Sequence, residues 1–146
     1  MKLPDVNVLI HAVDTTHPNH AVARSWLQSA LADTGGVGFA WLVLVGFVRV
    51  STRAGILTQP LSVPDALGIM DDWLGHAGAR VVHPGERHAG VLGALLLTAG
   101  TGGNLANDAH LGALAIEHDA RVGTFDKDFK RFPGVKIDLL KTKSAS

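Results

Sequence analysis

The 146-residue sequence contains no cysteine. This absence excludes disulfides, thiolate metal ligands and cysteine nucleophiles, and it fits a reducing compartment. An excess of either charge is also lacking, because 13 basic and 13 acidic residues give a net charge of zero with neutral histidines. Without a global basic field, any RNA or DNA binding must depend on a local patch. A metal ion, if bound, must be held by carboxylates or imidazoles.

Uninterrupted hydrophobic runs of membrane-spanning length are missing as well. The first apolar stretch, LPDVNVLIHAV, contains Asp5 and Asn7 where a secretory signal requires an uncharged core. The longest uncharged span, from His88 to Asn107, is interrupted by glycines and asparagines. We therefore expect a cytoplasmic protein without a membrane segment.

Hydrophobic residues nevertheless make up 47% of the chain, enough for a substantial buried core. The length suits one compact domain. We expect this domain to cover residues 1–140 and to be followed by a polar tail at residues 141–146.

Hydrophobic periodicity predicts strands that alternate with helices. A short first strand should end near Asp5 and turn into a helix. Further strands are predicted at residues 37–41, 79–83 and 120–125, and further helices at residues 17–33, 63–76, 86–100 and 107–119. Periodicity alone does not decide between a helix and a strand at residues 42–53, and the length of this run favours a helix. The strands are apolar on both faces, which is typical of a parallel sheet covered by helices.

Three aspartates lie where such a fold would bring them together. Asp5 and Asp126 each follow a predicted strand, and Asp108 lies at the start of the helix before the last predicted strand. Ligands of open α/β sheets bind beyond the carboxyl ends of the strands, so we expect the three carboxylates at one edge. Oxygen ligands of this kind suit magnesium or manganese.

Each acid also has a purely structural interpretation. Asp108 could cap a helix, and Asp126 and Asp128 could form a turn. Asp5 is harder to explain in this way, because a carboxylate among apolar residues needs a partner. Nearby polar side chains could orient the carboxylates or equally serve as turn and cap residues: Asn7, Asn104 and Thr124.

Basic residues gather near the C-terminus and could counter the acids when a polyanion approaches, although exposed lysines are usually just solvated. They are Lys127, Lys130, Arg131, Lys136, Lys141 and Lys143, with Arg49 as a further candidate. The pair His17 and His20 lacks a third ligand at a recognisable spacing and is a weak zinc candidate. The three tryptophans, Trp26, Trp41 and Trp73, are expected in core or dimer contacts.

Three segments together resemble the PIN-domain nucleases, and among them the VapC toxins of toxin–antitoxin pairs. They are DVNVLIHA near the N-terminus, WLVLVGFVRVST in the middle and NDAHLGALAIEHDARVGTFDKDFKRFPGV near the C-terminus. The resemblance spans nearly the whole chain and implies a three-layer α/β/α sandwich with a central, mainly parallel sheet. It also implies a magnesium- or manganese-dependent endoribonuclease, often acting on tRNA or rRNA. A homodimer and inhibition by a small VapB-type antitoxin are further implications.

Position by position, the resemblance makes Asp5, Asp108 and Asp126 metal ligands and Asp128 a fourth catalytic acid. One position departs from the family pattern, since Gly46 stands where many members have a glutamate. An RNA-binding or regulatory module that has lost catalysis is therefore an alternative. A phosphoacceptor domain is a third hypothesis, ranked last because the early strand offers a single aspartate.

Overall fold

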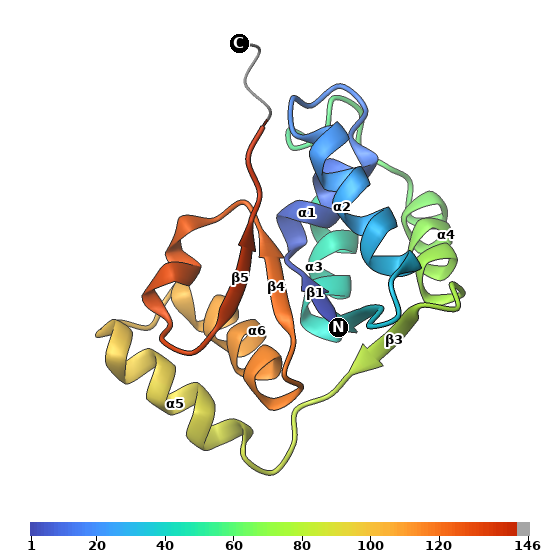
Figure 1. Ribbon diagram of the computed structural model, residues 1–146. Helices are drawn as coiled ribbons and strands as arrows, with labels where there is room; N and C mark the ends of the chain where they lie inside the picture. Colours follow the sequence, from blue (N-terminus) through green and yellow to red (C-terminus); the bar gives the residue numbers. More distant parts are fainter. Residues whose placement is uncertain (143–146) are drawn as a thin grey trace.

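The computed structural model describes residues 1–142. Within these residues, short strands form one sheet: β1 (Lys2–Pro4), β2 (Val37–Ala40), β3 (Ala79–Val82), β4 (Arg121–Thr124) and β5 (Lys136–Leu139). The order is β3-β2-β1-β4-β5, and every neighbouring pair is parallel. The predicted parallel sheet is confirmed, with β1 at its centre (Figure 1).

Helices connect the strands and cover the sheet. They are α1 (Val6–Val13), α2 (His20–Ala32), α3 (Trp41–Ser51), α4 (Val63–Leu74), α5 (His88–Ala99) and α6 (Leu105–Glu117). Parallel strands need such crossovers, because the chain must return to the same end of the sheet before each new strand. Among the helices of the described residues, none has both the length and the hydrophobicity to span a bilayer.

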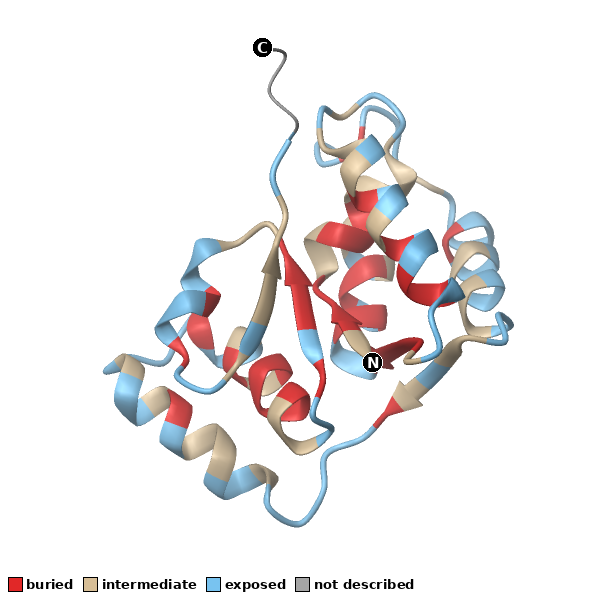
Figure 2. Cartoon of the chain, in the orientation of Figure 1, coloured by how far each residue is buried: buried red, intermediate tan, exposed pale blue. Residues whose placement is uncertain are grey.

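The two faces of the sheet are covered by different helices. Trp26 of α2 bonds to Asp138 of β5, so α2 lies on the face to which Asp138 points. In Figure 1, α6 lies behind β4 and β5, and Figure 2 shows buried residues concentrated in the central strands, α3 and α6. The predicted α/β/α sandwich is therefore confirmed.

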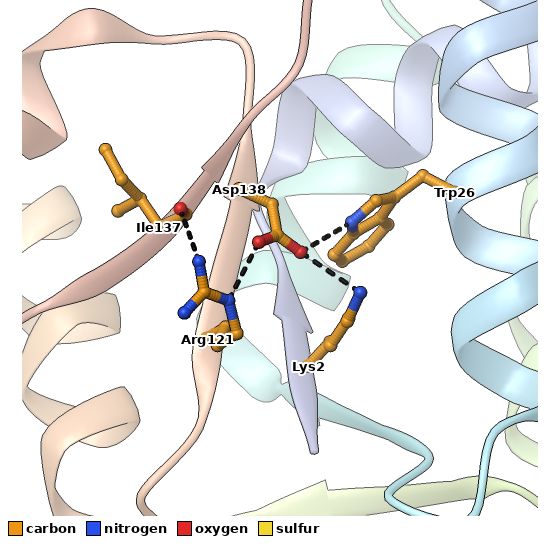
Figure 3. Close-up of polar contacts among 5 residues, drawn as sticks. All are labelled: Lys2, Trp26, Arg121, Ile137 and Asp138. Atoms are coloured by element: carbon orange, nitrogen blue, oxygen red, sulfur yellow. Dashed lines mark hydrogen bonds and ion pairs between the residues drawn. The ribbon is translucent and has the colours of Figure 1, made fainter.

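A polar cluster holds β5 and α2 to the centre of the sheet (Figure 3). The Asp138 carboxylate accepts hydrogen bonds from the Trp26 indole at 3.0 Å and from Arg121 Nε at 2.8 Å. Lys2 Nζ lies 3.2 Å from the same carboxylate. Burial alone would raise the pKa of Asp138, but hydrogen bonds from Arg121, Trp26 and Lys2 outweigh it and lower the pKa.

Two sequence predictions need correction. Strand β5 was not expected, because its sequence contains no hydrophobic run. Its position depends on pairing with β4 and on contacts such as the hydrogen bond between Trp26 and Asp138. The late helix begins at Leu105 rather than at Asn107, because residues 102–104 already form the turn that leads into it. Asp108 therefore lies within the first turn of α6 and is not its first residue.

Candidate active site

The carboxylate of Asp5 is fixed where β1 ends and α1 begins. Asp5 is the N-cap of α1, and its Oδ1 accepts a hydrogen bond from the Val6 backbone N–H at 2.8 Å. Its Oδ2 accepts a bond from the Thr124 hydroxyl at 2.7 Å, and its backbone N–H donates to Gly123 O of β4. These bonds satisfy a side chain that is only 9% exposed.

Burial nevertheless raises the pKa of Asp5 above its usual value, with a smaller contribution from nearby Asp126. The hydrogen bonds from Thr124 and Val6 act in the opposite direction and lower the pKa without cancelling the effect of burial. The partner expected for this buried aspartate is thus Thr124, one of the polar residues that could orient the carboxylates.

Asp108 is the acid whose ionisation is most perturbed. Burial, followed by the charges of Asp5, Asp126 and Asp128, raises its pKa from 3.8 to about 7. The N-cap of α6 is Asn104 and Asp108 lies within the first turn, so the capping interpretation does not account for Asp108. The three neighbouring acids thus disfavour the charged form of Asp108, in addition to its burial.

Asp126 caps a short helix and also lines the cavity that contains Asp5 and Asp108. Its Oδ1 accepts a bond from the Asp128 backbone N–H at 2.8 Å and caps the 3-10 helix η1 (Lys127–Arg131). Its own backbone N–H donates to the Thr124 hydroxyl, which links it to Asp5. Asp128 is exposed and, unlike Asp126, does not line the cavity described next.

A cavity of about 540 Å³ brings these acids together beyond the carboxyl ends of β1 and β4. Its polar lining residues are Asp5, Asn7, His11, Arg49, Asn104, Asn107, Asp108 and Asp126. Its remaining wall is apolar and comes largely from α3. The expected convergence of three acids at one sheet edge is therefore observed, and their roles remain predictions.

Two cavity residues were missed from the sequence. His11 lies four residues after Asn7 on α1, and Asn107 lies just before Asp108. The spacing of Asn7 and His11 places them on one helical face, a signal that could have identified His11. Asn7 itself accepts a bond from the Phe125 backbone N–H at 3.3 Å, tying α1 to the segment after β4.

The type and charge of the cavity side chains fit a hard divalent cation, because several carboxylate and amide oxygens surround one space. Their spacing is looser than that of a formed site: within residues 1–142, no three histidine, aspartate or glutamate side chains are grouped closely enough to hold a metal ion. The raised pKa of Asp108 shows that this negative charge is poorly compensated in the protein alone.

Gly46 lies on α3 in the wall of the cavity, against α1. A Cβ atom at this position would lie 2.9 Å from Val6 Cγ2, which is too close for an undisturbed contact. Val6 directly follows Asp5, so a larger residue at position 46 would push on the start of α1. Glycine at position 46 therefore does two things: it leaves out the carboxylate that many family members have there, and it leaves room for Val6.

The predicted basic cluster is only partly available to a polyanion. Lys136 pairs with Asp119, and Arg131 donates to the Ala99 carbonyl. Lys127, Lys130 and Lys141 are exposed, whereas Lys143 lies outside the described residues. Arg49 is exposed at the cavity wall.

The histidine pair and the tryptophans have mostly local roles. His17 Nδ1 accepts a bond from the Asn19 N–H, and His20 Nδ1 donates to the His11 carbonyl. Trp73 packs against Phe39 and Phe47 in the core. Trp26 bonds to Asp138, but Trp41 is 47% exposed and is not a core residue.

Comparisons with known proteins agree with this architecture. The PIN domain family model matches residues 2–135. Ribonuclease VapC37 of Mycobacterium tuberculosis is 46% identical over 138 residues, covering 94% of this chain and 96% of that protein. Ribonuclease VapC33 of the same species is 35% identical, covering 93% of this chain and 95% of that protein.

Solved structures show the same fold. VapBC2 of Rickettsia felis, bound to a DNA fragment from its promoter, gives a TM-score of 0.69 at 19% identity, covering 94% of this chain and 96% of that chain. FitAcB of Neisseria gonorrhoeae gives a TM-score of 0.62 at 20% identity, with the same coverage. The family model and the two curated relatives cover nearly the whole chain, and the chain therefore belongs to the PIN-domain family and to its VapC group.

Proposed function

We propose that this protein is the toxin of a type II toxin–antitoxin pair and hydrolyses RNA phosphodiester bonds as a magnesium- or manganese-dependent endoribonuclease. Structured RNA such as tRNA or rRNA is the proposed substrate, and a VapB-type antitoxin is the proposed inhibitor. The proposal includes a single nuclease domain over residues 1–140, a homodimer and action in the cytoplasm. Its main support is the convergence of three carboxylates in one cavity of a VapC-group chain.

In this proposal, Asp5, Asp108 and Asp126 hold the ion. A bound divalent cation supplies Lewis acidity, activates water and stabilises charge on the phosphate. Thr124 keeps Asp5 oriented through the 2.7 Å hydrogen bond. The carboxylates repel one another when no cation is present, so a cation would allow them to approach.

Other cavity residues would act on the RNA. The Arg49 guanidinium is placed to attract a phosphate group to the acid cavity. Asn104 and Asn107 offer amide groups to the phosphate or to water. Asp128, which adds negative charge near Asp108 from outside the cavity, is a supporting acid in this proposal.

Cleavage of a structured RNA by the purified protein tests the function. The wild-type protein should cut the RNA with magnesium or manganese and stop cutting when EDTA is added. Asp5→Ala should abolish cleavage, whereas Asp72→Asn, an exposed change on α4, should leave it intact. Undiminished cleavage by Asp5→Ala would refute the assignment.

An RNA-binding module without catalysis is the second candidate. It is favoured by Gly46 in the glutamate position and by the loose spacing of the acids in the described residues. This candidate predicts RNA binding with no cleavage at millimolar manganese. Cleavage that depends on Asp5 would exclude it.

A further inference from the structure

A second pocket lies next to the acid cavity, across the short segment from Phe125 to Lys127. Its volume is about 410 Å³, and it is lined by Asn19, Phe125, Lys127, Leu139, Leu140, Lys141 and Thr142. Asp126 lines the acid cavity, whereas Phe125 and Lys127 line this second pocket. The backbone that carries the proposed metal ligand therefore also supplies the wall between the two spaces.

Two rings form part of this wall. The His11 ring lines the acid cavity and meets the Phe125 ring edge to face, with the ring centroids 5.1 Å apart. His17 stacks on the His11 ring, with the ring centroids 4.0 Å apart. Phe125 is half-buried, and its backbone N–H is held by Asn7. The ring is thus fixed in place and still reaches the second pocket.

The charge of the second pocket is opposite to that of the acid cavity. Lys127 and Lys141 line it, and among residues 1–142 no carboxylate lines it. Asn19 adds an amide group, whose oxygen contacts the Thr142 hydroxyl. Without a bound cation, a phosphate would be repelled by the acids on one side of Phe125 but attracted by the lysines on the other.

We propose that this second pocket binds a nucleotide of single-stranded RNA adjacent to the one held at the acid cavity. The phosphate lies against Lys127 and Lys141, and the base packs on Phe125. This inference rests on the proposed function, because it assigns the path of the same RNA strand. It makes Lys127, Lys141 and Phe125 positioning residues that guide the strand across the metal site.

The aromatic wall favours a nucleotide over an acidic peptide. Lysines alone would attract either polyanion, but a fixed ring beside them offers a surface on which a base can stack. Base–aromatic stacking of this kind changes affinity by roughly five-fold or more per base. Because every base has a flat face, the pocket should accept different bases with small preferences.

Fluorescence anisotropy with a fluorescein-labelled hexauridylate tests this site. EDTA is present throughout, so the readout requires neither metal nor cleavage. Lys127→Glu combined with Lys141→Glu should weaken binding by about ten-fold or more and should flatten the salt dependence by about 0.7 per lost phosphate contact. The charge-matched control combines Arg53→Glu with Arg80→Glu, because neither exposed arginine lines either space.

The ring is tested separately by Phe125→Leu and Phe125→Tyr. The leucine variant should lose about five-fold or more in affinity, and the tyrosine variant, which keeps the flat ring, should retain it. Thermal unfolding checks that these variants are folded. If Phe125→Leu does not fold, the hexauridylate affinity of the Lys127→Glu and Lys141→Glu double variant still tests the proposal.

Several outcomes would overturn the inference. They are absent hexauridylate binding by the wild type, equal losses in the lysine and arginine variants, and equally tight binding of a labelled hexaglutamate peptide. The last result would assign the pocket to an acidic peptide. Failure of the proposed function is recognised separately, as absent metal-dependent cleavage of structured RNA by the wild type.

Discussion

The Asp108 carboxyl group connects the burial of the acid cavity with its proposed chemistry. Its folded-state pKa of about 7 lies above the ordinary value of 3.8, so the folded protein binds the Asp108 proton more tightly than the unfolded chain does. In metal-free protein, this favourable contribution is fully present below about pH 4. It is lost as the pH rises towards and through 7.

Asp108→Asn should therefore stabilise the metal-free protein at pH 8 by about 1–2 kcal/mol. This free energy is smaller than the one that corresponds to the full pKa shift, because the Asp108 side chain is partly exposed to solvent. At pH 5 the gain should be smaller than at pH 8, because the folded wild type still binds the Asp108 proton while the unfolded chain has released it. Thermal unfolding in EDTA at both pH values measures the difference, and a variant less stable than the wild type at pH 8 would contradict this explanation.

Gly46 provides a second residue-scale prediction. Gly46→Ala gains about 1 kcal/mol of helix propensity but crowds Val6, which costs roughly 1–3 kcal/mol. We expect a net loss of stability of about 1 kcal/mol, together with slower RNA cleavage because the start of α1 and Asp5 are displaced.

The compensating change Val6→Ala removes the crowding methyl group. In the double variant, both stability and cleavage should recover relative to Gly46→Ala alone. A double-mutant cycle in thermal unfolding and cleavage rate measures this coupling. Strictly additive effects would show that the two residues do not interact.

Sequence reasoning reached the three main acids because each follows a recognisable strand or helix signal. It did not reach the hydrogen bond from Thr124 to Asp5 or the contact of His11 with Phe125, because these connect residues more than a hundred positions apart. It also placed Asp128 with the other acids. In the structure, Asp128 is outside the cavity and influences Asp108 only through its charge.

At the scale of elements, α2 is held against β4 by close packing of Trp26 on Gly123. A Cβ atom at position 123 would overlap the Trp26 indole ring. Gly123→Ala should therefore destabilise the protein by about 2–3 kcal/mol.

Gly90→Ala is the matched control on exposed α5. Nothing lies within 4 Å of a Cβ atom at this position, and helix propensity should raise the free energy of unfolding by about 1 kcal/mol. Denaturant unfolding separates the two, and similar effects would argue against this packing.

Helix α5 is attached to α6 through Glu117. The Glu117 carboxylate accepts bonds from His88 Nδ1 at 2.6 Å and from the Gly85 backbone N–H at 3.0 Å, and His88 Nε2 lies 2.9 Å from His110 Nδ1. Burial alone would raise the pKa of Glu117, but the bonds from His88 and Gly85 outweigh it and lower the pKa. Its stabilising contribution is therefore present above about pH 4.5 and lost as the pH falls.

Glu117→Gln should cost about 1–2 kcal/mol at pH 7, because the charge-assisted hydrogen bonds to His88 and Gly85 are weakened. Glu86→Gln, an exposed change nearby, should have little effect. Urea unfolding at pH 7 provides the comparison. The difference between the two variants should shrink as the pH falls below 4.5, and a constant difference would contradict the assigned hydrogen bonds.

Most elements were predictable because their hydrophobic residues recur at helical spacing or form short buried runs. The helix at residues 42–53 was correctly preferred over a strand on length alone, and it appears as α3. Strand β5 was missed because only two of its four residues are apolar, and its position depends on pairing with β4. Tertiary contacts of this kind leave little local signal.

At the scale of the whole molecule, the proposed function depends on the parallel sheet, whose strands all end at the same edge. The carboxyl ends of β1 and β4 share an edge, so Asp5 and Asp126 meet there, and α6 brings Asp108 to the same space. The PIN domain family model matches nearly the whole chain, residues 2–135. The central claim is that these acids bind a divalent cation.

Calorimetric titration of manganese into the metal-free protein at pH 8 tests this claim most directly. Asp108 is then ionised, and we expect saturable binding below millimolar manganese. Binding should be lost in Asp108→Asn and retained in Asp72→Asn, the exposed control on α4. Absent binding at millimolar manganese, or unchanged binding by Asp108→Asn, would contradict the account.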